Sequence, residues 1–485
     1  MSDLIWESAS SLTARLRAKE ISAVEVMDAF YTQIERENPK LNALVNLLDR
    51  SEARLLAAKA DDLLARGDEV GPLHGLPMAP KDLVDARGFP TTFGFIPYAR
   101  KIAAEDCALV ARQRSAGAIF IGKSNVPEFG LGSHTFNSLF GTTRNPYDLD
   151  KTAGGSSGGA AVALASGMLP IADGSDMGGS LRNPASFCNV VGLRPSTGRV
   201  PYERTFGWFA RLGTSGPMAR TVADVALLLS VQAGPFPADP LTLDVEGSTF
   251  RRPLDANLSG VRLAWSPNLT GVPVDARVTS VLEKTLAVFE DLGCSVENNC
   301  PDLSEAMAVF QVQRAAALAI LGGSLDRTLP DWRTHVKDTM IWNVDKGLAL
   351  TTKDLLASEV TRTEIYRQLE EFFASYDALL LPAAQVPPFP ADQDWVREIN
   401  GEPMETYIDW MTVCCAISVT GLPAISVPGG FTDEGLPIGL QIVGKPRGEF
   451  ELLQLAHAFE QATGHHRRKP DLSITSVAQQ TNQTD

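Results

Sequence analysis

The sequence predicts an α/β protein built around a mixed β-sheet, and two stretches carry this prediction. The chain is predicted to form an apolar strand over 261–265, an amphipathic helix over 275–292 and a second strand over 294–297, an order that favours parallel pairing. Residues 424–428 and 439–444 are predicted as two further strands that form an antiparallel hairpin through a turn at residues 433–435. Parallel and antiparallel pairs in one chain indicate a mixed sheet.

Length and composition limit the class of protein. With 485 residues, 44% of them hydrophobic, the chain can form one large α/β domain or two or three ordinary ones. A net charge of −15 argues against a nucleic-acid surface, which needs clustered Lys and Arg. The six cysteines show no metal-site spacing and are too few for a disulfide framework, so we expect reduced thiols and no metal. The first residues do not resemble a signal peptide, and no run of eighteen apolar residues occurs. We therefore expect a cytoplasmic protein with no membrane partner.

Helices are predicted on both sides of these strands. Apolar residues at three- and four-residue spacing predict two helices between residues 10 and 37, with Ser22 as an N-cap, and a third helix over residues 50–66. Further helices are expected over 222–232, 303–375 (several helices) and 450–462. A helix followed by a strand is expected over 108–122. The Pro- and Asp-rich connection at 235–258 is the best candidate for a domain boundary, and the polar tail from residue 471 is expected to be disordered.

Two glycine-framed serine turns are the most informative feature. They lie at residues 154–159 and 178–180, and the apolar, Ala-rich segment between them predicts a buried helix. Glycine allows positive φ and close backbone approach, so such turns can direct a hydroxyl and several N–H groups at one point. A single turn of this kind is often only a flexible loop, but two that flank one helix favour chemistry.

A lysine in an apolar segment is the best candidate base. Residues 78–84 are mostly apolar and contain Lys81. Such a lysine either extends to solvent or, when desolvated, loses its proton easily and can act as a general base. The neighbouring Asp82 is a reason for caution, because its carboxylate could keep Lys81 charged.

Two familiar motifs are rejected. Residues 155–159 fit the G-x-S-x-G pattern of an α/β-hydrolase, but residues 151–153 make a poor strand before it and no later histidine is a persuasive partner. Residues 117–124 fit the P-loop pattern, yet the middle positions are strand-like and Pro127 interrupts the helix that should follow. Two serines and one lysine remain as candidates, namely Lys81, Ser156 and Ser180.

These residues, together with the segments around residues 176–182, 187–188 and 192–195, closely resemble the amidase signature family. The resemblance continues at 421–428 and 435–441, so it covers nearly the whole chain. The family's lysine, bridging serine and nucleophilic serine match Lys81, Ser156 and Ser180, with the two serines 24 positions apart as the pattern requires. Three departures lie outside the triad: Ala153, Ser175 and Asn189 replace the usual Pro, Thr and Gly.

The resemblance implies a fold and its parts. We expect a single large α/β/α domain over residues 1–470, with a central mixed β-sheet covered by helices on both faces, and a disordered tail over 471–485. Within the domain, the N-terminal helical layer covers about 1–68, the signature core about 70–232 and a helical insertion about 303–375. The peptide bond between Gly155 and Ser156 is expected to be cis.

The resemblance also implies an activity: hydrolysis of the C–N bond of a small linear or aryl amide through a Ser-Ser-Lys triad. Neutral Lys81 would take the proton of Ser180 through Ser156, and Ser180 would form an acyl-enzyme without any metal or organic cofactor. The oxyanion would be bound by the N–H groups of Met177, Gly178 and Gly179. The acyl site would be lined by Gly130, Leu131 and Gly132.

Two other functions are kept open. One is the A subunit of glutamyl-tRNA amidotransferase, which releases ammonia from glutamine with partner subunits. That subunit usually carries Ser-Leu-Asp-Gln before a Gly-Pro pair, whereas this chain has Ala210–Ser215 there, after Trp208 and Phe209. The difference favours a stand-alone amidase, and the aromatic pair hints at an apolar or aryl group near the site. The other is a non-catalytic scaffold of the same fold, against which the complete triad argues. A homodimer also stays open.

Overall fold

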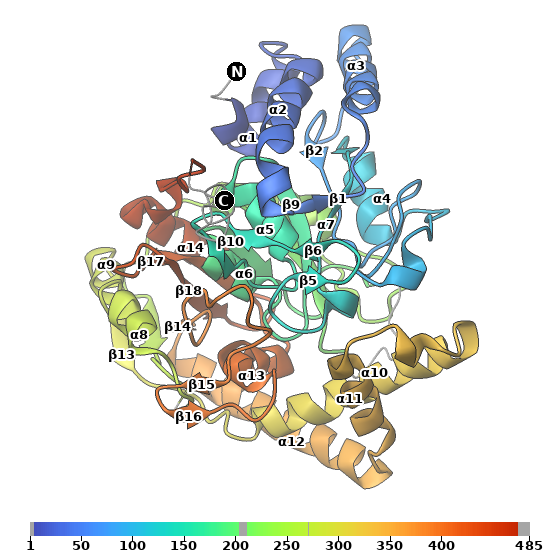
Figure 1. Cartoon of the computed structure of the whole chain (residues 1–485). Coiled ribbons are helices and arrows are strands. Elements are labelled where there is room, and N and C mark those ends of the chain that lie inside the picture. Colours follow the sequence, from blue (N-terminus) through green and yellow to red (C-terminus); the bar gives the residue numbers. More distant parts are fainter. Residues whose placement is uncertain (1–3, 203–210, 270, 474–485) are drawn as a thin grey trace, which may run out of the picture.

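An eight-stranded mixed β-sheet runs through the centre of the protein, whose computed structural model describes residues 4–202, 211–269 and 271–473 (Figure 1). In spatial order the strands are β13 (Ser295–Asn298), β12 (Arg262–Trp265), β14 (Ala378–Pro382), β18 (Pro437–Gly444), β17 (Ala424–Phe431), β10 (Val191–Arg194), β11 (Thr214–Ala219) and β9 (Ile171–Asp176). β12 pairs in parallel with β13 and β14, and the other neighbours are antiparallel. The predicted mixed sheet is confirmed, including the parallel pair and the hairpin.

β9 lies at one edge of this sheet. It pairs with β11 through six consecutive antiparallel positions, from Ile171 opposite Ala219 to Asp176 opposite Thr214. Successive side chains of a strand point to opposite faces, so Asp173 and Ser175 share one face of β9 and Asp176 lies on the other.

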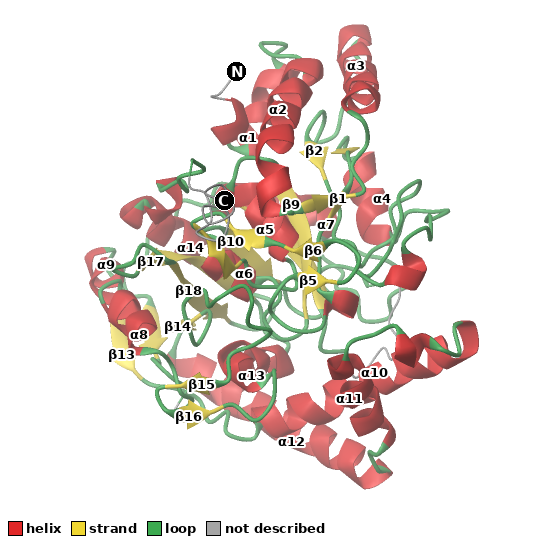
Figure 2. Ribbon diagram, viewed as in Figure 1, coloured by secondary structure: helices red, strands yellow, loops and turns green. Residues whose placement is uncertain are grey.

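Helices flank the sheet (Figure 2). Those that contact its strands include α5 (Gly158–Ala165), α6 (Arg182–Phe187), α7 (Val222–Gln232), α8 (Ala276–Glu283) and α14 (Glu449–Thr463). α4 (Ala108–Ser115) packs on α7, and α13 (Thr412–Thr420) packs on the helices of residues 306–375. α5 contacts β9 and β11, α6 contacts β10, β17 and β18, and α14 contacts β17 and β18. The α/β architecture with a helix-covered sheet therefore agrees with the prediction.

Three N-terminal helices lie at one end of the molecule, drawn in blue in Figure 1. They are α1 (Ala9–Arg17), α2 (Ala23–Leu41) and α3 (Arg50–Arg66). Ser22 caps α2 as predicted: its hydroxyl accepts the Glu25 N–H at 3.1 Å, and the Glu25 carboxylate accepts the Ser22 N–H at 2.8 Å.

The helical insertion forms the opposite corner and consists of α10 (Ala306–Thr328), α11 (Asp338–Leu348) and α12 (Thr352–Ser375). α10 contacts α11, α12 and α13. A Cβ at Gly347 would lie 2.0 Å from the Ala315 carbonyl oxygen, so glycine allows α11 to approach α10 closely. By length and composition alone α10 could cross a membrane, as could many core helices, and nine of its residues are buried within the protein.

Two predicted elements differ from the structure. The single helix expected over 275–292 is two helices, α8 (Ala276–Glu283) and α9 (Leu286–Asp291), because the Thr285 hydroxyl and N–H both bond to the Leu282 carbonyl and tighten the turn. The connection at 235–258 is not a domain boundary, because the strands on either side of it, β11 and β12, belong to the same sheet.

Five short strand pairs lie outside the central sheet in the described part of the chain. They are β1 (Leu44–Val45) with β4 (Lys123–Ser124), β2 (Pro77–Met78) with β3 (Ile119–Phe120), β5 (Phe136–Asn137) with β6 (Gly141–Thr142), β7 (Arg144–Asn145) with β8 (Asp148–Thr152), and β15 (Glu398–Ile399) with β16 (Glu402–Pro403). The prediction of a poor strand at residues 151–153 was wrong for Lys151 and Thr152, which belong to β8. This strand pairs with β7 and not with the central sheet, because the Asn145 amide donates to the Thr152 carbonyl at 3.0 Å.

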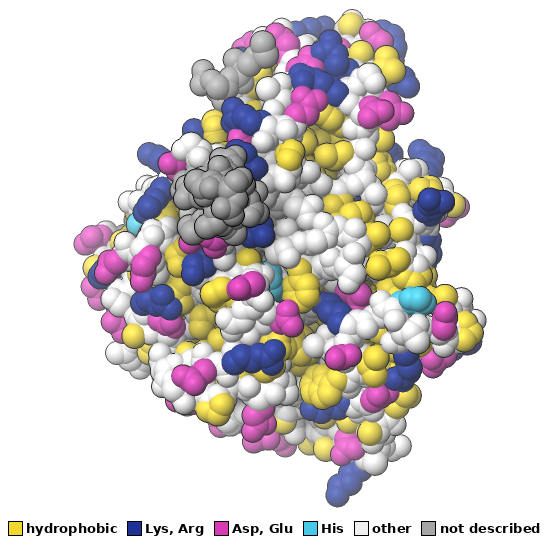
Figure 3. Space-filling model, in the orientation of Figure 1, with side chains coloured by type: hydrophobic (Ala, Val, Ile, Leu, Met, Phe, Trp, Pro, Cys, Tyr) yellow, Lys and Arg dark blue, Asp and Glu magenta, His cyan; other side chains and the backbone are white. Residues whose placement is uncertain are grey.

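Short 3-10 turns complete the chain: η1 (Leu4–Trp6), η2 (Ile96–Tyr98), η3 (Glu128–Gly130), η4 (Gly247–Arg251), η5 (Trp332–Thr334), η6 (Asp409–Met411) and η7 (His465–Arg467). On the face drawn in Figure 3, acidic and basic side chains are mixed, so this face carries no broad basic area.

Candidate active site

The two serine turns lie against each other. Ser156 and Ser157 directly precede α5, whose residues are all buried as the sequence predicts, and the chain then returns through β9 to the turn that ends at Ser180. The Ser157 N–H donates to the Ser180 carbonyl at 3.2 Å. The peptide bond between Gly155 and Ser156 is cis, as the resemblance implied.

Glycine is required in both turns by close contacts. A Cβ at Gly159 would lie 2.3 Å from the Asn125 nitrogen, and Gly179 has a φ of +113° with Cys414 only 2.7 Å from the Cβ position. A larger residue would push the first turn away from Asn125 and the second turn away from Cys414 of α13. Asn189 has a φ of +54°, a left-handed conformation that asparagine tolerates better than most residues.

Lys81 lies beneath the first turn with its side chain surrounded by hydroxyl groups. Its Nζ is 2.8 Å from Ser156 Oγ, 2.8 Å from Ser157 Oγ and 3.0 Å from Ser175 Oγ, and it also reaches the Ser175 carbonyl at 3.2 Å. Only 1% of the residue is exposed. Burial lowers the pKa of Lys81 from 10.5 to about 7, although Asp176 and Asp173 oppose the change. Lys81 can therefore exchange a proton near neutral pH.

Asp82 points away from the turns and does not pair with the Lys81 ammonium. Its carboxylate accepts the N–H of Thr92 at 3.0 Å and also the Thr92 hydroxyl, and it lies 3.9 Å from the Lys123 Nζ. The chain turns directly after Lys81, where the N–H groups of Leu83 and Val84 both donate to the Lys81 carbonyl, and this turn directs the Asp82 side chain toward Thr92. Because the Asp82 carboxylate points toward Thr92 and Lys123, it does not contact the Lys81 ammonium and does not hold that lysine in the charged form through an ion pair.

The second turn offers backbone N–H groups beside Ser180. Met177, Gly178 and Ser180 are half-buried, and in the described part of the chain their N–H groups have no hydrogen-bond partner. The Gly179 N–H differs, because it already donates to Asp176 Oδ1 at 2.9 Å. The Ser180 hydroxyl likewise has no hydrogen-bond partner among the described residues, so the two turns are joined here by the backbone bond between Ser157 and Ser180.

Asp176 holds the second turn in place through hydrogen bonds and ion pairs. It accepts the N–H of Leu181 at 3.1 Å and pairs with Arg182 at 2.9 Å and Arg194 at 3.2 Å, all fully buried. Burial alone would raise the pKa of Asp176, but the two guanidinium groups outweigh burial and hold this pKa below its usual range. The turn thus rests on a charged network that stays ionised at neutral pH.

The sequence analysis proposed Lys81, Ser156 and Ser180 and did not include two contacts of the lysine. Ser157 and Ser175 bond to the Lys81 Nζ, and neither was proposed as part of the site. A signal was present for Ser157, which neighbours Ser156 in the same turn. Ser175 could be found only once the pairing of β9 was known.

The predicted acyl-site residues lie beside the first turn. A Cβ at Gly130 would be 3.5 Å from Ser156 Oγ and 2.8 Å from Leu83 Cδ1, and one at Gly132 would be 3.7 Å from the Tyr407 ring. Leu131 packs against a small apolar cluster of mostly aromatic and branched residues. That cluster consists of Phe95, Leu325, Trp332, Met340 and Val344 with neighbours that include Phe93 and Phe129. Trp208 and Phe209, the predicted aromatic loop, lie outside the described residues.

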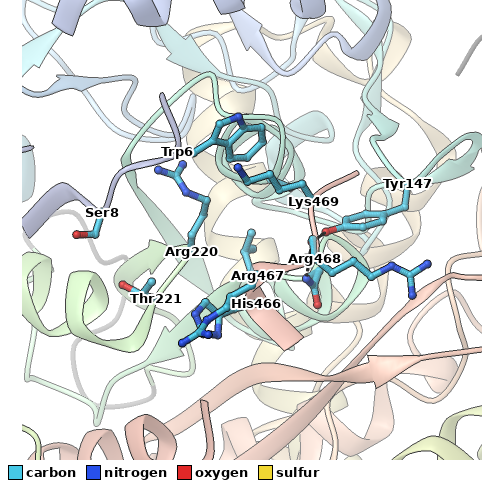
Figure 4. Close-up of a pocket in the computed structure, with 12 residues that line it drawn as sticks. Trp6, Ser8, Tyr147, Arg220, Thr221, His466, Arg467, Arg468 and Lys469 are labelled. Carbon is cyan, nitrogen blue, oxygen red and sulfur yellow. Dashed lines mark hydrogen bonds between the residues drawn. The ribbon is translucent and has the colours of Figure 1, made fainter. Parts of the chain in front are cut away.

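A separate cavity of about 280 Å³ lies elsewhere, at the ends of α5 and α6 that are remote from the serines (Figure 4). Its walls include Ala165, Asn189, Arg220, His466 and Lys469. Figure 4 shows Arg220 and Lys469 beside Trp6. Arg220 donates to the carbonyls of Leu164 and Leu169 at 3.2 and 2.8 Å, so its charge satisfies the end of α5. In the described residues no group of His, Cys, Asp and Glu side chains is arranged to hold a metal ion.

Comparison with known proteins places the chain in a family. The model of the Amidase family matches residues 25–453. An acylamidase of Rhodococcus erythropolis is 36% identical over 479 residues, which cover 97% of this chain and 98% of the relative. The A subunit of glutamyl-tRNA(Gln) amidotransferase of Carboxydothermus hydrogenoformans is 35% identical over 493 residues, covering 97% and 100% of the two chains.

A solved structure gives the same result. A bacterial aryl acylamidase of the amidase signature enzymes superimposes with a TM-score of 0.88 at 29% identity, covering 95% of this chain and 98% of the other. The chain therefore belongs to the amidase signature family. The similar proteins named above carry the names acylamidase, aryl acylamidase and amidotransferase A subunit.

Proposed function

We propose that this chain is a stand-alone amidase that hydrolyses a small linear or aryl amide to a carboxylate and an amine. The observation that carries the proposal is the position of the Lys81 Nζ, buried among hydroxyls and 2.8 Å from Ser156 Oγ, with a pKa of about 7. A neutral amine at this place can accept a proton from a serine hydroxyl.

In the proposed mechanism, Ser156 passes a proton between Ser180 and Lys81. Ser180 attacks the amide carbonyl carbon while its proton moves to Ser156 and the Ser156 proton moves to Lys81. Collapse of the tetrahedral intermediate breaks the C–N bond, and the amine leaves with the proton returned along the same path. Water then attacks the acyl-enzyme by the reverse route and releases the carboxylate. All of the proton transfers use groups of the chain itself.

The oxyanion of each tetrahedral intermediate is stabilised, in this proposal, by the N–H groups of Met177 and Gly178. Both are half-buried and have no partner among the described residues, which leaves them free to donate. The Gly179 N–H already donates to Asp176, so it could reach the oxyanion only by sharing its hydrogen between the two acceptors. We therefore assign Gly179 mainly to the shape of the turn. Loss of one such donor commonly costs about a hundredfold or more in rate.

The substrate class is proposed from two observations. The apolar cluster beside Gly130, Leu131 and Gly132 is suited to an aryl or apolar acyl group. The relatives named acylamidase and aryl acylamidase have similar length and architecture.

All six cysteines are free thiols, which favours a reducing compartment, and we propose the cytoplasm. A homodimer stays a prediction.

The test is amide hydrolysis by the purified chain alone. The panel contains aryl anilides, short aliphatic amides, amino-acid amides and glutamine, and Lys81→Ala and Ser180→Ala are compared with the surface variants Lys284→Ala and Ser51→Ala. We expect turnover of an aryl or aliphatic class that is lost in the first pair and kept in the second. Turnover that survives Ser180→Ala, or a wild-type chain that a fluorophosphonate does not label at Ser180, would overturn the assignment.

An amidotransferase A subunit is the second candidate, since relatives with that name are about as similar as the acylamidase. This reading predicts that glutamine is the substrate and that hydrolysis by the isolated chain is weak. The same panel separates the two: efficient hydrolysis of anilides without any added subunit supports the stand-alone amidase, and activity confined to glutamine supports the subunit.

A further inference from the structure

We propose that the separate cavity binds a phosphate group, with Arg220 and Lys469 as its main ligands. The cavity is formed by η1, the turn between β11 and α7, and the segment that follows η7 (Figure 4). The ligand is inorganic phosphate or a small molecule that carries a phosphate. The inference does not depend on the amidase reaction, because the cavity lies away from the serine turns.

The charged side chains that line the cavity are all basic. The cavity has a volume of about 280 Å³, and the described residues of its walls include Arg220, Arg467, Arg468 and Lys469 but no Asp or Glu. The whole chain has 58 acidic and 43 basic residues, so the cavity reverses the charge balance of the molecule. His466 also lines it and is neutral at pH 7, because burial and the charge of Arg467 lower its pKa to about 4. A hollow surrounded by charges of one sign attracts ions of the other sign.

The partners of these cations are neutral. Arg220 donates to the carbonyls of Leu164, Leu169 and Glu7 at 3.2, 2.8 and 2.8 Å. The Arg468 guanidinium lies 3.9 Å from the centre of the Phe431 ring. Carbonyls and rings orient a cation without cancelling its charge, so the positive charge of the cavity remains available to an anion.

The carboxylate that acts on Arg220 is Asp224, and its oxygens are occupied elsewhere. Asp224 Oδ2 accepts the Ala9 N–H and Oδ1 accepts the Ser10 N–H, both at 2.9 Å. Asp224 therefore holds the start of α1 and forms no ion pair with the Arg220 guanidinium in the described structure.

Two of the cations approach the same aromatic ring. The Lys469 Nζ lies 4.4 Å from the centre of the Trp6 ring and the Arg220 Cζ lies 5.8 Å from it. Figure 4 shows both side chains beside the indole. Two like charges at one ring repel each other. An anion bound between them would remove this repulsion and would accept hydrogen bonds from the guanidinium and the ammonium.

A phosphate group fits this arrangement better than a single carboxylate. It carries a charge of about −1.5 to −2 at pH 7 and three strong acceptor oxygens, so it can satisfy two cations at once. Two hydroxyls in the walls can add donors. Ser8 and Thr221 each accept a helix N–H, at 3.1 and 3.2 Å, and no acceptor for their own hydrogens is present among the described residues.

The test is isothermal titration calorimetry of the full chain with two probes, inorganic phosphate and glycerol 1-phosphate, at pH 7.5 and constant ionic strength. We expect saturable binding with a Kd of about 1 mM or lower that weakens as NaCl is added. The probe that binds more tightly identifies the source of the phosphate group. Lys469 is exposed and is therefore the residue to change, whereas Arg220 also holds the end of α5.

Lys469→Gln should raise the Kd about tenfold, and Lys469→Glu should abolish binding. The matched control is Lys346→Gln, which removes another exposed ammonium beside a tryptophan: the Lys346 Nζ lies 4.8 Å from the centre of the Trp342 ring, outside the cavity. This variant should bind both probes like the wild type.

Three results would overturn the inference. The first is the absence of saturable heat up to about 20 mM of either probe. The second is a Kd that is unchanged in Lys469→Glu, or one that rises equally in Lys346→Gln, because the anion would then respond to net charge and not to this cavity. The third is tighter binding of citrate than of both phosphates, which would contradict the phosphate assignment.

Discussion

The backbone N–H of Ser157 donates to the carbonyl of Ser180 across 3.2 Å, so the two serine turns are joined directly although 23 residues of chain separate these serines. This bond fixes the distance between the hydroxyl that contacts Lys81 and the turn that holds Ser180. A shift of one turn relative to the other would stretch or break this bond.

The first prediction concerns pH. Burial lowers the pKa of Lys81 to about 7, and the base must be neutral to accept a proton. We therefore expect kcat/KM to be low below pH 6, to rise through a midpoint near 7 and to level off above 8. The measurement is a pH profile at constant ionic strength. Lys81→Arg, which keeps its charge throughout this range, should be inactive at every pH.

Ser157 and Ser175 provide the second prediction. Each hydroxyl bonds to the Lys81 Nζ, at 2.8 and 3.0 Å, and either substitution by alanine removes one neutral acceptor. A hydrogen bond of this kind contributes about 1 kcal/mol, so kcat should fall about fivefold to tenfold with little change in KM. Steady-state kinetics of Ser157→Ala and Ser175→Ala measures this. A larger rise in KM than fall in kcat would point instead to substrate binding.

The third prediction concerns stability. Arg182→Met leaves the buried carboxylate of Asp176 with one guanidinium fewer and should lower the free energy of unfolding by about 3 kcal/mol or more. The matched control is Arg66→Met, which breaks an exposed pair with Asp68 and should change stability by less than about 0.5 kcal/mol. Chemical denaturation of both variants compares them. Equal effects would mean that the Asp176 network is not needed for folding.

Two glycines with similar backbones give the fourth prediction. Gly130 and Gly67 have φ values of +71° and +80°, so alanine is strained at either position by about 1 kcal/mol. A Cβ at Gly130 would also meet Leu83 and approach Ser156, whereas nothing lies within 4 Å of a Cβ at Gly67. Gly130→Ala should therefore lose amide hydrolysis and Gly67→Ala should keep it. Amide hydrolysis is measured for each variant and divided by the concentration of folded protein, which separates a loss of catalysis from a loss of stability.

Much of the fold could be predicted because its signals are local. The apolar spacing and the Ser22 cap located α2, and the strand pattern with a polar turn located the β17–β18 hairpin. The order of strands across the sheet could not be obtained in this way, since β10 lies between β17 and β11 through contacts between distant segments. The split of α8 from α9 depends on one hydroxyl at Thr285, which apolar spacing does not reveal.

The candidate site shows the same limit. Glycine-framed serines and an apolar-flanked lysine are local patterns, so Lys81, Ser156 and Ser180 could be proposed from the sequence. The direction of the Asp82 side chain depends on Thr92 and Lys123, and the occupied N–H of Gly179 depends on Asp176. These are properties of packing around each group, which residue types and spacing do not determine.

The edge position of β9 has a consequence for how this molecule must be assembled. One face of the strand gives Asp173 to the Lys81 backbone and Ser175 to the Lys81 side chain, while the other face gives Asp176 to two arginines. A slip of one residue against β11 would exchange these faces and place the Asp176 carboxylate where the Ser175 hydroxyl now contacts the lysine. The six paired positions of β9 and β11 therefore set the register on which the surroundings of Lys81 depend, since a carboxylate in place of Ser175 would keep the Lys81 amine protonated.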